Sequence, residues 1–285
     1  METNDLITKI QINYPSFTKA EKHVADFILE NPRKVLYMSI TDLADASKVG
    51  DTSVFRFCRT LRFDGYQKFK MSLAQDITAL DGKPQEFSGE IEETDSFDEV
   101  LRKVLHTHVS ALNETYEQIN KDDISLAVQY LVDARKVVFF GVGSSLVTAM
   151  EATDKFMRIT DKMTCTIDSH QQTMTASLLK KEDAAVIISF SGSTRDCVDI
   201  AKICRQNGVK VICITRFGKS PLTRYSDLTL LLGANEHPLQ GGSITARISQ
   251  LFLLDILYIE YFRKTYQESG ENRKKTSASV ADKLY

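Results

Sequence analysis

The sequence predicts two domains: a small all-α domain, followed by an α/β domain in which helices flank a parallel five-stranded sheet. At 285 residues the chain exceeds the usual size of a single domain. Its first quarter shows only helical spacing of apolar residues, whereas the second half alternates short apolar runs with helical segments. We therefore expect the helical domain over residues 1–78, a linker over 79–98, the α/β domain over 99–264 and a polar tail over 265–285.

The overall composition sets limits on the class of protein. The formal net charge is -2 and 42% of the residues are hydrophobic, so any nucleic-acid contact must come from a local basic cluster. The five cysteines form no C-x-x-C pair, which argues against a disulfide framework or a zinc site. No basic region leads into an apolar run at the N-terminus, and no apolar stretch is long enough to span a bilayer. We expect a cytoplasmic protein with no membrane partner, bound metal or cofactor.

The helical domain begins with a clear helix signal. The segment Thr18-Lys19-Ala20-Glu21 fits a capping box, and apolar residues then follow at helical spacing until Asn31-Pro32 ends the helix. A second short helix is expected from about Thr41 to Ser47. The turn Lys48-Val49-Gly50 separates it from a third helix over residues 52–61, for which Asp51 is the expected N-cap.

The third helix has two distinct faces. Val54, Phe57, Cys58 and Leu61 form a stripe for burial, while the other face carries Thr52, Ser53, Arg56 and Arg59. Two helices joined by a three-residue turn with Gly, the second with Arg and hydroxyl side chains outward, are typical of a helix-turn-helix. The pattern alone also fits a solvated helix face on a small bundle.

Composition changes after this domain. Asp81-Gly82-Lys83-Pro84 breaks the preceding helix, and the following residues are acidic and poor in apolar side chains. We interpret residues 79–98 as a linker that DNA would repel.

The rest of the chain predicts the parallel sheet. Helical segments separate the apolar runs at residues 137–140, 164–167, 184–188, 209–214 and 228–232. Near-continuous apolar runs of this kind are typical of strands buried on both faces. A strongly apolar last helix is expected from 243 to 262, either fully buried or in a dimer interface, and the tail beyond it is expected to be solvated.

Two strand ends carry matching polar loops. Gly141-Val142-Gly143-Ser144-Ser145 follows the first strand, and Ser189-Phe190-Ser191-Gly192-Ser193-Thr194 follows the third. In an open parallel sheet both loops would face the same crevice beyond the carboxyl ends of the strands. Free N–H groups at helix N-termini, together with small hydroxyl side chains, attract phosphate. We therefore expect a phosphomonoester site.

The same loops fit two other kinds of site. A nucleotide site is suggested by Gly141-x-Gly143 and the later Asp168, but Leu146 stands where the dinucleotide fingerprint needs a third small residue, and no Walker A lysine pattern is present. A sugar-phosphate isomerase would need a proton-transferring carboxylate or imidazole. The candidates are Glu151, Glu236, His170 and His237, and none lies in a recognised catalytic motif.

These motifs together resemble a known family. The two hydroxyl loops resemble the sugar-phosphate loops of the SIS (sugar isomerase) domain, and the order helix-turn-helix, acidic linker, SIS domain is similar to the RpiR family of bacterial transcription regulators. Further matching segments are 54–59, 65–70, 220–222 and 246–248. Two positions depart from the family pattern: Gly50 replaces a frequent serine before the recognition helix, and Arg62 replaces a usual glycine, which puts the geometry of that turn in question.

The resemblance implies a regulator rather than an enzyme, with a phosphorylated sugar or amino sugar as effector and double-stranded operator DNA as partner. It implies phosphate contacts from Ser145, Ser189, Ser191 and Thr194, with Ser144 beside them and Asp168-Ser169-His170 near the sugar; Gly192 and Ser193 complete the expected effector site. For DNA, we expect Thr52, Ser53 and Arg56 to read base edges and Arg59, Arg62, Lys68 and Lys70 to contact phosphates. We expect a homodimer or homotetramer, and isomerase activity is the alternative.

Overall fold

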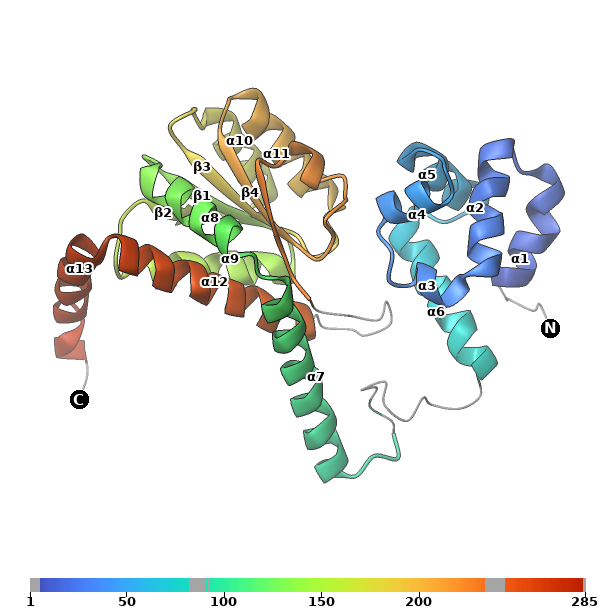
Figure 1. Cartoon of the computed structure of the whole chain (residues 1–285), viewed down its shortest axis with the longest axis horizontal. Helices are drawn as coiled ribbons and strands as arrows, with labels where there is room; N and C mark the ends of the chain where they lie inside the picture. The colour runs from blue at the N-terminus through green and yellow to red at the C-terminus, as the bar shows by residue number, and fades with distance from the viewer. Residues whose placement is uncertain (1–5, 82–90, 92, 234–243, 284–285) are drawn as a thin grey trace. The chain divides into compact units, whose positions relative to one another are not determined.

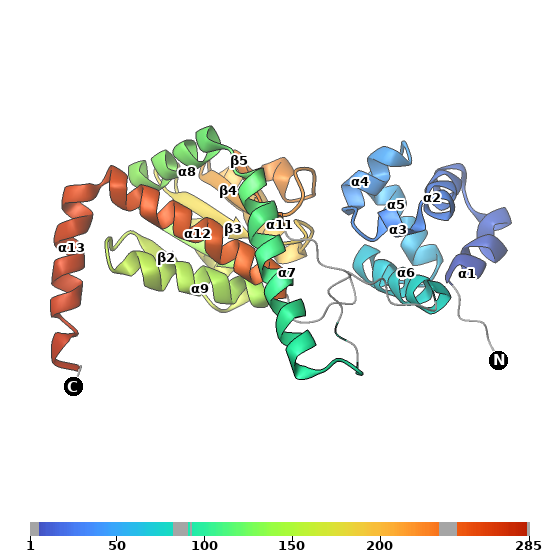
Figure 2. The same cartoon turned by 60° about the horizontal axis from the view of Figure 1, so that its bottom comes forward.

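The computed structural model describes residues 6–81, 91, 93–233 and 244–283, with the backbone alone at 78–81 and 282. The described residues divide into two compact units, one up to His108 and the other from Val109 onward. Figures 1 and 2 show the elements of each unit. No helix within the described ranges is long and apolar enough to cross a bilayer.

The first unit is helical, as the sequence predicts. Its elements are α1 (Leu6–Asn13), a 3-10 turn η1 (Tyr14–Ser16), α2 (Lys19–Glu30), α3 (Pro32–Val35), α4 (Ile40–Ala46), α5 (Asp51–Thr60), α6 (Tyr66–Asp81) and the first part of α7 (Phe97–Gln118). The predicted capping box of α2 is confirmed: Thr18 accepts from the Glu21 amide, and Glu21 accepts from the Thr18 amide. Both ends of the predicted linker are helical, and its residues 82–90 and 92 lie outside the described part.

The core of this unit is aromatic. Phe57 packs edge-to-face against Phe17 and Phe69, with ring centroids 5.2 and 5.7 Å apart. The predicted stripe of α5 is confirmed, since all four of its side chains are buried. Edge-to-face pairs add about 0.5–1.5 kcal/mol each beyond the burial of their area. This core fixes α5 with its polar face outward.

The ends of α4 and α5 share one unusual feature. Lys48 and Arg62 each follow a helix in the left-handed region, with φ of 55° and 68°. The next amide closes a Schellman motif in both places, Val49 N–H to Ala44 O and Phe63 N–H to Cys58 O, each at 2.9 Å. Arg62 therefore adopts the turn that glycine would adopt, at a cost of about 1–2 kcal/mol.

One detail of the recognition helix differs from the prediction. Gly50 occupies the N-cap position and Asp51 is the first helical residue, so the predicted Asp51 cap is wrong. The reason is a tertiary bond: the Asp51 carboxylate accepts from the Thr41 hydroxyl of α4 at 3.0 Å.

The second unit contains the predicted five-stranded parallel sheet, with strand order β2-β1-β3-β4-β5. The strands are β1 (Val137–Gly141), β2 (Met163–Cys165), β3 (Ala184–Ile188), β4 (Lys210–Thr215) and β5 (Leu228–Leu231). β2 is shorter than predicted, because residues 166–168 already lead into the cap of the next helix.

Helices cover both faces of this sheet (Figures 1 and 2). α8 (Lys121–Asp133), α9 (Ser144–Met157) and α12 (Ile244–Lys264) pack on one face, and α10 (Ser169–Leu178) and α11 (Arg195–Gln206) on the other. Successive strand residues alternate between the two cores: Val186 and Ile188 lie in the first, Ala185 and Ile187 in the second. The near-continuous apolar strands of the sequence follow from this double burial.

The polar C-terminal segment is helical. α13 (Tyr266–Ala278) follows α12, and a 3-10 turn η3 (Ala281–Lys283) follows it. Asn272 donates to the carbonyl of Ile159 at 3.0 Å, and Thr276 donates to that of Arg158 at 2.9 Å. These bonds hold α13 against the end of α9 although most of its side chains are exposed.

Candidate functional site

The two hydroxyl loops lie next to each other at the carboxyl edge of the sheet. β1 has β2 on one side and β3 on the other. The strands are therefore added to the sheet in opposite directions from β1, and the topological switch point lies between β1 and β3. Gly141 pairs with Ile188 at the end of these two strands, and the two loops start there. Open α/β sheets bind ligands outside such a switch point.

The helices that follow the two loops begin without a side-chain cap. Gly143 is the N-cap residue of α9, and Thr194 is that of α11, and neither helix has a capping side-chain bond. α10, which follows β2, is different, since Asp168 accepts from the Gln171 amide at 2.9 Å. The amides at the starts of α9 and α11 are therefore the ones left for an anion.

The second loop brings most of the predicted effector residues together. The Ser189 hydroxyl donates to Thr194 Oγ1 at 3.4 Å. Ser193 donates to Ser191 through both its amide, at 3.3 Å, and its hydroxyl, at 3.1 Å. Ser189 is buried, whereas the other three are half-buried. The four hydroxyl residues thus form two hydrogen-bonded pairs within one loop, called the hydroxyl cluster below.

The remaining predicted residues differ in exposure. Ser145 is buried at the start of α9, while Ser144 and His170 are exposed. His170 lies in the first turn of α10 and forms no hydrogen bond or ion pair with any other described residue. The structure thus places Ser145 in a fixed environment and leaves His170 free in solvent.

A third loop, after β4, forms hydrogen bonds to the backbone of the loop that carries the hydroxyl cluster. Thr215 donates its hydroxyl to the carbonyl of Phe190 at 3.1 Å, and the Leu222 amide donates to that of Gly192 at 2.9 Å. Gly192 has a φ of 60°, and a Cβ on it would lie 2.3 Å from the hydroxyl oxygen of the buried Ser220. The Ser-Pro-Leu segment at 220–222 was a matching motif of the sequence, but its contact with this loop was not predicted.

Two buried glutamines near the site were also missed by the sequence analysis. Gln172 donates to the carbonyl of Gly141 at 3.0 Å, and its Oε1 is buried without a partner in the described structure. Gln250 of α12 donates to Ser145 Oγ at 3.2 Å. The signal that could have revealed Gln250 is its position in a strongly apolar helix, where a buried amide needs partners.

The isomerase candidates do not gather around the loops. Glu151 is exposed on α9, whereas Glu236 and His237 lie outside the described residues. Burial raises the pKa of Cys197, which contacts Ser189, to about 12, so this thiol is neutral and a poor nucleophile. In the described parts of the chain, no group of three His, Cys, Asp or Glu side chains could hold a metal ion.

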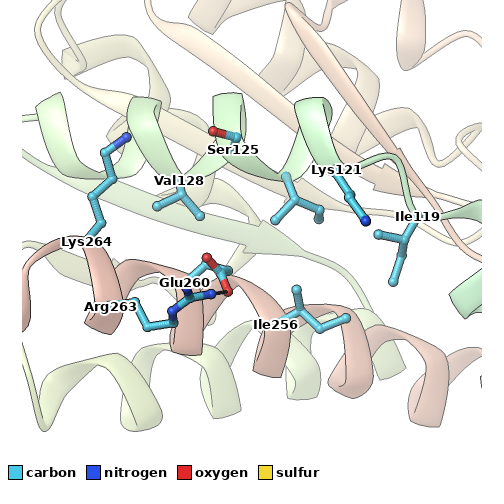
Figure 3. A pocket seen from close by; sticks show the side chains of 9 residues that line it. Ile119, Lys121, Ser125, Val128, Ile256, Glu260, Arg263 and Lys264 are labelled. Carbon is cyan, nitrogen blue, oxygen red and sulfur yellow. Dashed lines mark hydrogen bonds and ion pairs between the residues drawn. The ribbon is translucent and has the colours of Figure 1, made fainter.

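A groove of about 680 Å³ lies elsewhere in this unit, between α8 and α12 (Figure 3). Apolar side chains such as Val128 and Ile256 line it, and an ion pair joins Glu260 and Arg263 at 2.5 Å. The N-terminus of α8 is already capped, because the Asn120 side chain accepts from the amides of Asp122 and Asp123. None of the predicted effector residues lines this groove, and it lacks the free helix amides of the switch point.

The predicted DNA-reading face of α5 is exposed. Thr52, Arg56 and Arg59 are exposed and Ser53 is half-buried. Arg62, at the left-handed turn after α5, is also exposed. These side chains can therefore be reached by a duplex.

Two of the predicted phosphate contacts share a carboxylate. Asp64 accepts from Lys68 at 2.6 Å and from Arg59 at 2.9 Å. These bonds hold the pKa of Asp64 below its usual value, and Lys68 has the larger effect of the two. Exposed pairs of this kind contribute little stability, so DNA phosphates can compete for both cations.

The predicted phosphate contact of Lys70 is not supported. Its side chain is buried, and its ammonium donates to the carbonyls of Leu36 and Met38 at 3.4 and 3.1 Å. The ammonium also lies 5.2 Å from the centroid of the Tyr66 ring. Lys70 therefore donates to the carbonyls that follow the C-terminus of α3 and does not face solvent.

A helix-turn-helix domain with an exposed basic face, followed by a SIS-type α/β domain, defines a class of transcriptional regulators. Family models match the chain in both parts: the helix-turn-helix domain of the rpiR family over residues 4–79 and the SIS domain over residues 130–260. The chain belongs to the rpiR family of HTH-type transcriptional regulators, which confirms the predicted resemblance and fold.

Individual relatives cover nearly the whole chain. An HTH-type transcriptional regulator of Caldanaerobacter subterraneus subsp. tengcongensis is 33% identical over 273 residues, 96% of each chain. The regulator HexR of Pseudomonas aeruginosa is 34% identical over 253 residues, 89% of this chain and 87% of HexR. The structure of Vibrio vulnificus NanR, solved in complex with ManNAc-6P, is 26% identical and superposes with a TM-score of 0.85 over 98% of this chain and 99% of NanR.

Proposed function

We propose that this protein binds operator DNA through α5 and that a phosphorylated sugar or amino sugar, bound at the loops after β1 and β3, controls its DNA affinity. The observation that carries the effector site is the pair of uncapped helix N-termini, α9 and α11, beside hydroxyl loops at the switch point. The ManNAc-6P complex of the similar NanR supports the choice of a phosphosugar.

The phosphate would be held without a basic side chain. Ser145, Ser189, Ser191 and Thr194 would supply hydroxyl donors, and the uncapped first turns of α9 and α11 would supply backbone amides beside them. Each hydrogen bond to a charged oxygen contributes about 1.5–3 kcal/mol. A few such bonds are enough for a micromolar ligand.

The sugar end would lie toward α10, where His170 is exposed. The buried Oε1 of Gln172 has no partner among the described residues, which costs about 1–3 kcal/mol. Because this atom is buried, a hydroxyl or amide N–H of the effector would supply the missing donor only if α10 shifts on binding.

For DNA, Thr52, Ser53 and Arg56 would read base edges, and Arg59, Arg62 and Lys68 would contact phosphates. We propose that the protein acts in the cytoplasm as a homodimer or homotetramer. Support for self-association comes from apolar side chains on the exposed side of α9: Val147, Met150 and Met157. Symmetric pairing of such faces is the commonest way in which soluble chains assemble.

Regulation is favoured over isomerase activity for two reasons. Glu151, the carboxylate of α9 nearest the loops, is exposed. Among the described residues, no carboxylate or imidazole forms a hydrogen bond with the hydroxyl cluster. The test is a thermal-shift screen of the full chain against glucose 6-phosphate, fructose 6-phosphate, glucosamine 6-phosphate, ManNAc-6P and inorganic phosphate. A phosphosugar at about a hundred times its Kd should stabilise the protein by roughly 2.7 kcal/mol. NMR of the same mixtures should show no interconversion; turnover would establish the isomerase, and the absence of any shift would contradict the effector site.

A further inference from the structure

The buried amide of Gln250 connects the proposed phosphate site to the interior of the α/β unit. Gln250 is 2% exposed. Its Oε1 accepts from the Thr148 hydroxyl at 2.7 Å, and its Nε2 donates to Ser145 Oγ at 3.2 Å. The three residues form a chain of bonds from the interior of α9 to its N-terminus, and each bond runs in the same direction.

The direction of these bonds determines what the Ser145 hydroxyl can do. A serine hydroxyl has one proton to donate and two lone pairs to accept with. Because Gln250 already donates to Ser145 Oγ, the proton of Ser145 is directed elsewhere, and an effector phosphate next to the α9 N-terminus would accept it. Bonds arranged in one direction also polarise and strengthen one another.

The neighbouring residue of α12 reaches a different helix. Ser249 is fully buried and donates to the carbonyl of Ala111 in α7 at 3.2 Å. Thr115, one turn later in α7, donates to the same carbonyl at 2.7 Å and accepts from the Gly233 amide at 3.2 Å. Two adjacent residues of α12 therefore contact the start of α9 and the middle of α7.

α7 is the element through which a signal can leave this unit along the chain. It is one continuous helix from Phe97 to Gln118, and the boundary between the two compact units falls within it, after His108. A Cβ on Gly233 would lie 2.1 Å from the backbone of Glu114, so the chain two residues after the end of β5 also contacts α7 closely. A displacement of residues 109–118 would thus continue into the part of α7 that leads toward the DNA-binding domain.

We propose that Gln250 and Ser249 couple the effector site to α7: Gln250 orients the Ser145 hydroxyl toward the phosphate, and Ser249 links the resulting position of α12 to α7. The proposal rests on the proposed function, because it needs an effector phosphate at Ser145. An effector can shift DNA affinity only by binding one arrangement of the protein better than another. The hydrogen bond between Ser249 and Ala111 is the contact that would be kept in one arrangement and lost in the other.

The first experiment tests the orientation of Ser145. Gln250→Met keeps the length of the side chain but removes its N–H donor, so the Ser145 hydroxyl is no longer held with its proton toward the phosphate, while Thr148 still donates to the Ser144 carbonyl. The panel phosphosugar that binds the wild type best should bind this variant at least about tenfold more weakly in calorimetry. DNA affinity without effector should stay within about twofold of the wild type. Unchanged phosphosugar affinity would overturn the role of Gln250.

The second experiment tests the link to α7. Ser249→Ala leaves no unpaired group behind, since the Ala111 carbonyl still accepts from Thr115. The variant should bind the same phosphosugar within about threefold of the wild type, yet the change in DNA affinity that the phosphosugar causes should shrink at least about threefold. DNA affinity is measured on a duplex that the wild-type chain selects from a random library. Thr153→Ala, which removes a buried hydroxyl bonded within α9, is the matched control and should respond fully.

These outcomes separate the two proposals. If wild-type protein binds a phosphosugar and responds to it, but Ser249→Ala responds equally, the coupling through α7 is overturned and the proposed function stands. If no panel member binds the wild type, the effector site is overturned and the coupling with it.

Discussion

Gly192 and Ser220 are packed so closely that the two loops behind the proposed phosphate site form one unit. A Cβ on Gly192 would lie 2.3 Å from Ser220 Oγ and 2.6 Å from Ser220 Cβ. Since Gly192 also lies at a φ of 60°, both space and backbone conformation require glycine here. The loop after β4 therefore sets the hydroxyl positions of the loop after β3 before a ligand binds, which lowers the cost of binding.

Gly192→Ala should abolish effector binding. The left-handed backbone alone costs about 1–2 kcal/mol for alanine, and the contact with Ser220 must be relieved by moving the loop. We expect no thermal shift with any panel phosphosugar. Gly208→Ala is the matched control, because Gly208 has a φ of 73° at the other end of α11 but only an ordinary contact, 3.6 Å, for a Cβ. It should lose similar backbone stability and keep the thermal shift; a normal shift in Gly192→Ala would contradict the arrangement.

Arg56→Ala should relax sequence preference on DNA. Arg56 is exposed on the outward face of α5, and a bidentate contact to guanine is worth about 1–3 kcal/mol of discrimination. Binding to the selected duplex should weaken by that amount while binding to random duplex changes little. Arg59→Ala should instead weaken both duplexes alike and lower the salt slope by about 1. A variant of Arg56 with full discrimination would show that another residue reads the bases.

Lys70→Met should cost stability and leave DNA contacts intact. Removing the ammonium leaves the carbonyls of Leu36 and Met38 without this donor, at a cost of about 1–3 kcal/mol. The salt slope of DNA binding counts phosphate contacts and should not change. Lys68→Met is the reciprocal control, with a lower slope and nearly unchanged stability, because Lys68 is exposed. A reduced slope in Lys70→Met would restore the phosphate role that the sequence suggested.

Thr60→Val should destabilise the DNA-binding unit in a pH-dependent way. Burial alone would raise the pKa of Glu21, but hydrogen bonds from Thr60 and Thr18 and the charge of Arg56 outweigh it and hold that pKa below its usual value. A lowered carboxyl pKa stabilises the fold fully above the unfolded pKa of about 4.3, and this stabilisation is lost as the pH falls through the folded pKa. The 2.6 Å bond from Thr60 should therefore contribute about 1.5–3 kcal/mol at pH 7 and little once Glu21 is protonated.

Hydrogen exchange of the α2 and α5 amides measures this difference. Protection should fall in Thr60→Val at pH 7, and the gap to the wild type should close as the pH falls through the lowered folded pKa of Glu21. Thr60→Ser keeps the hydroxyl and should behave as the wild type. If the difference in amide protection persists at low pH, Thr60→Val is destabilised by altered packing and not by the loss of the hydrogen bond to the Glu21 carboxylate.

The sequence predicts the elements that local chemistry specifies. The capping box at Thr18, the buried stripe of α5 and the five apolar strands follow from spacing that the chain itself displays. The two hydroxyl loops were predictable as a pair because parallel strands end at one edge of a sheet. Their adjacency depends on the strand order, which the structure supplies.

Features that depend on distant contacts were not predictable. The cap of α5 shifts to Gly50 because Asp51 bonds to α4, and Lys70 is buried because the end of α3 offers it two carbonyls. Gln250 is 105 positions from Ser145 in the sequence, so no local pattern relates them. Such long-range bonds fix which polar residues of a motif face a ligand and which face the protein.

The central claim is that a phosphosugar held by the hydroxyl loop after β3 controls DNA binding. The most direct measurement is a mobility-shift titration of the selected duplex with wild-type protein and with the double variant Ser189→Ala, Ser191→Ala, each with and without the phosphosugar that binds the wild type best. The account predicts equal DNA affinity for both proteins without effector, a clear change for the wild type with it, and none for the double variant. A double variant that responds as fully as the wild type would contradict the account.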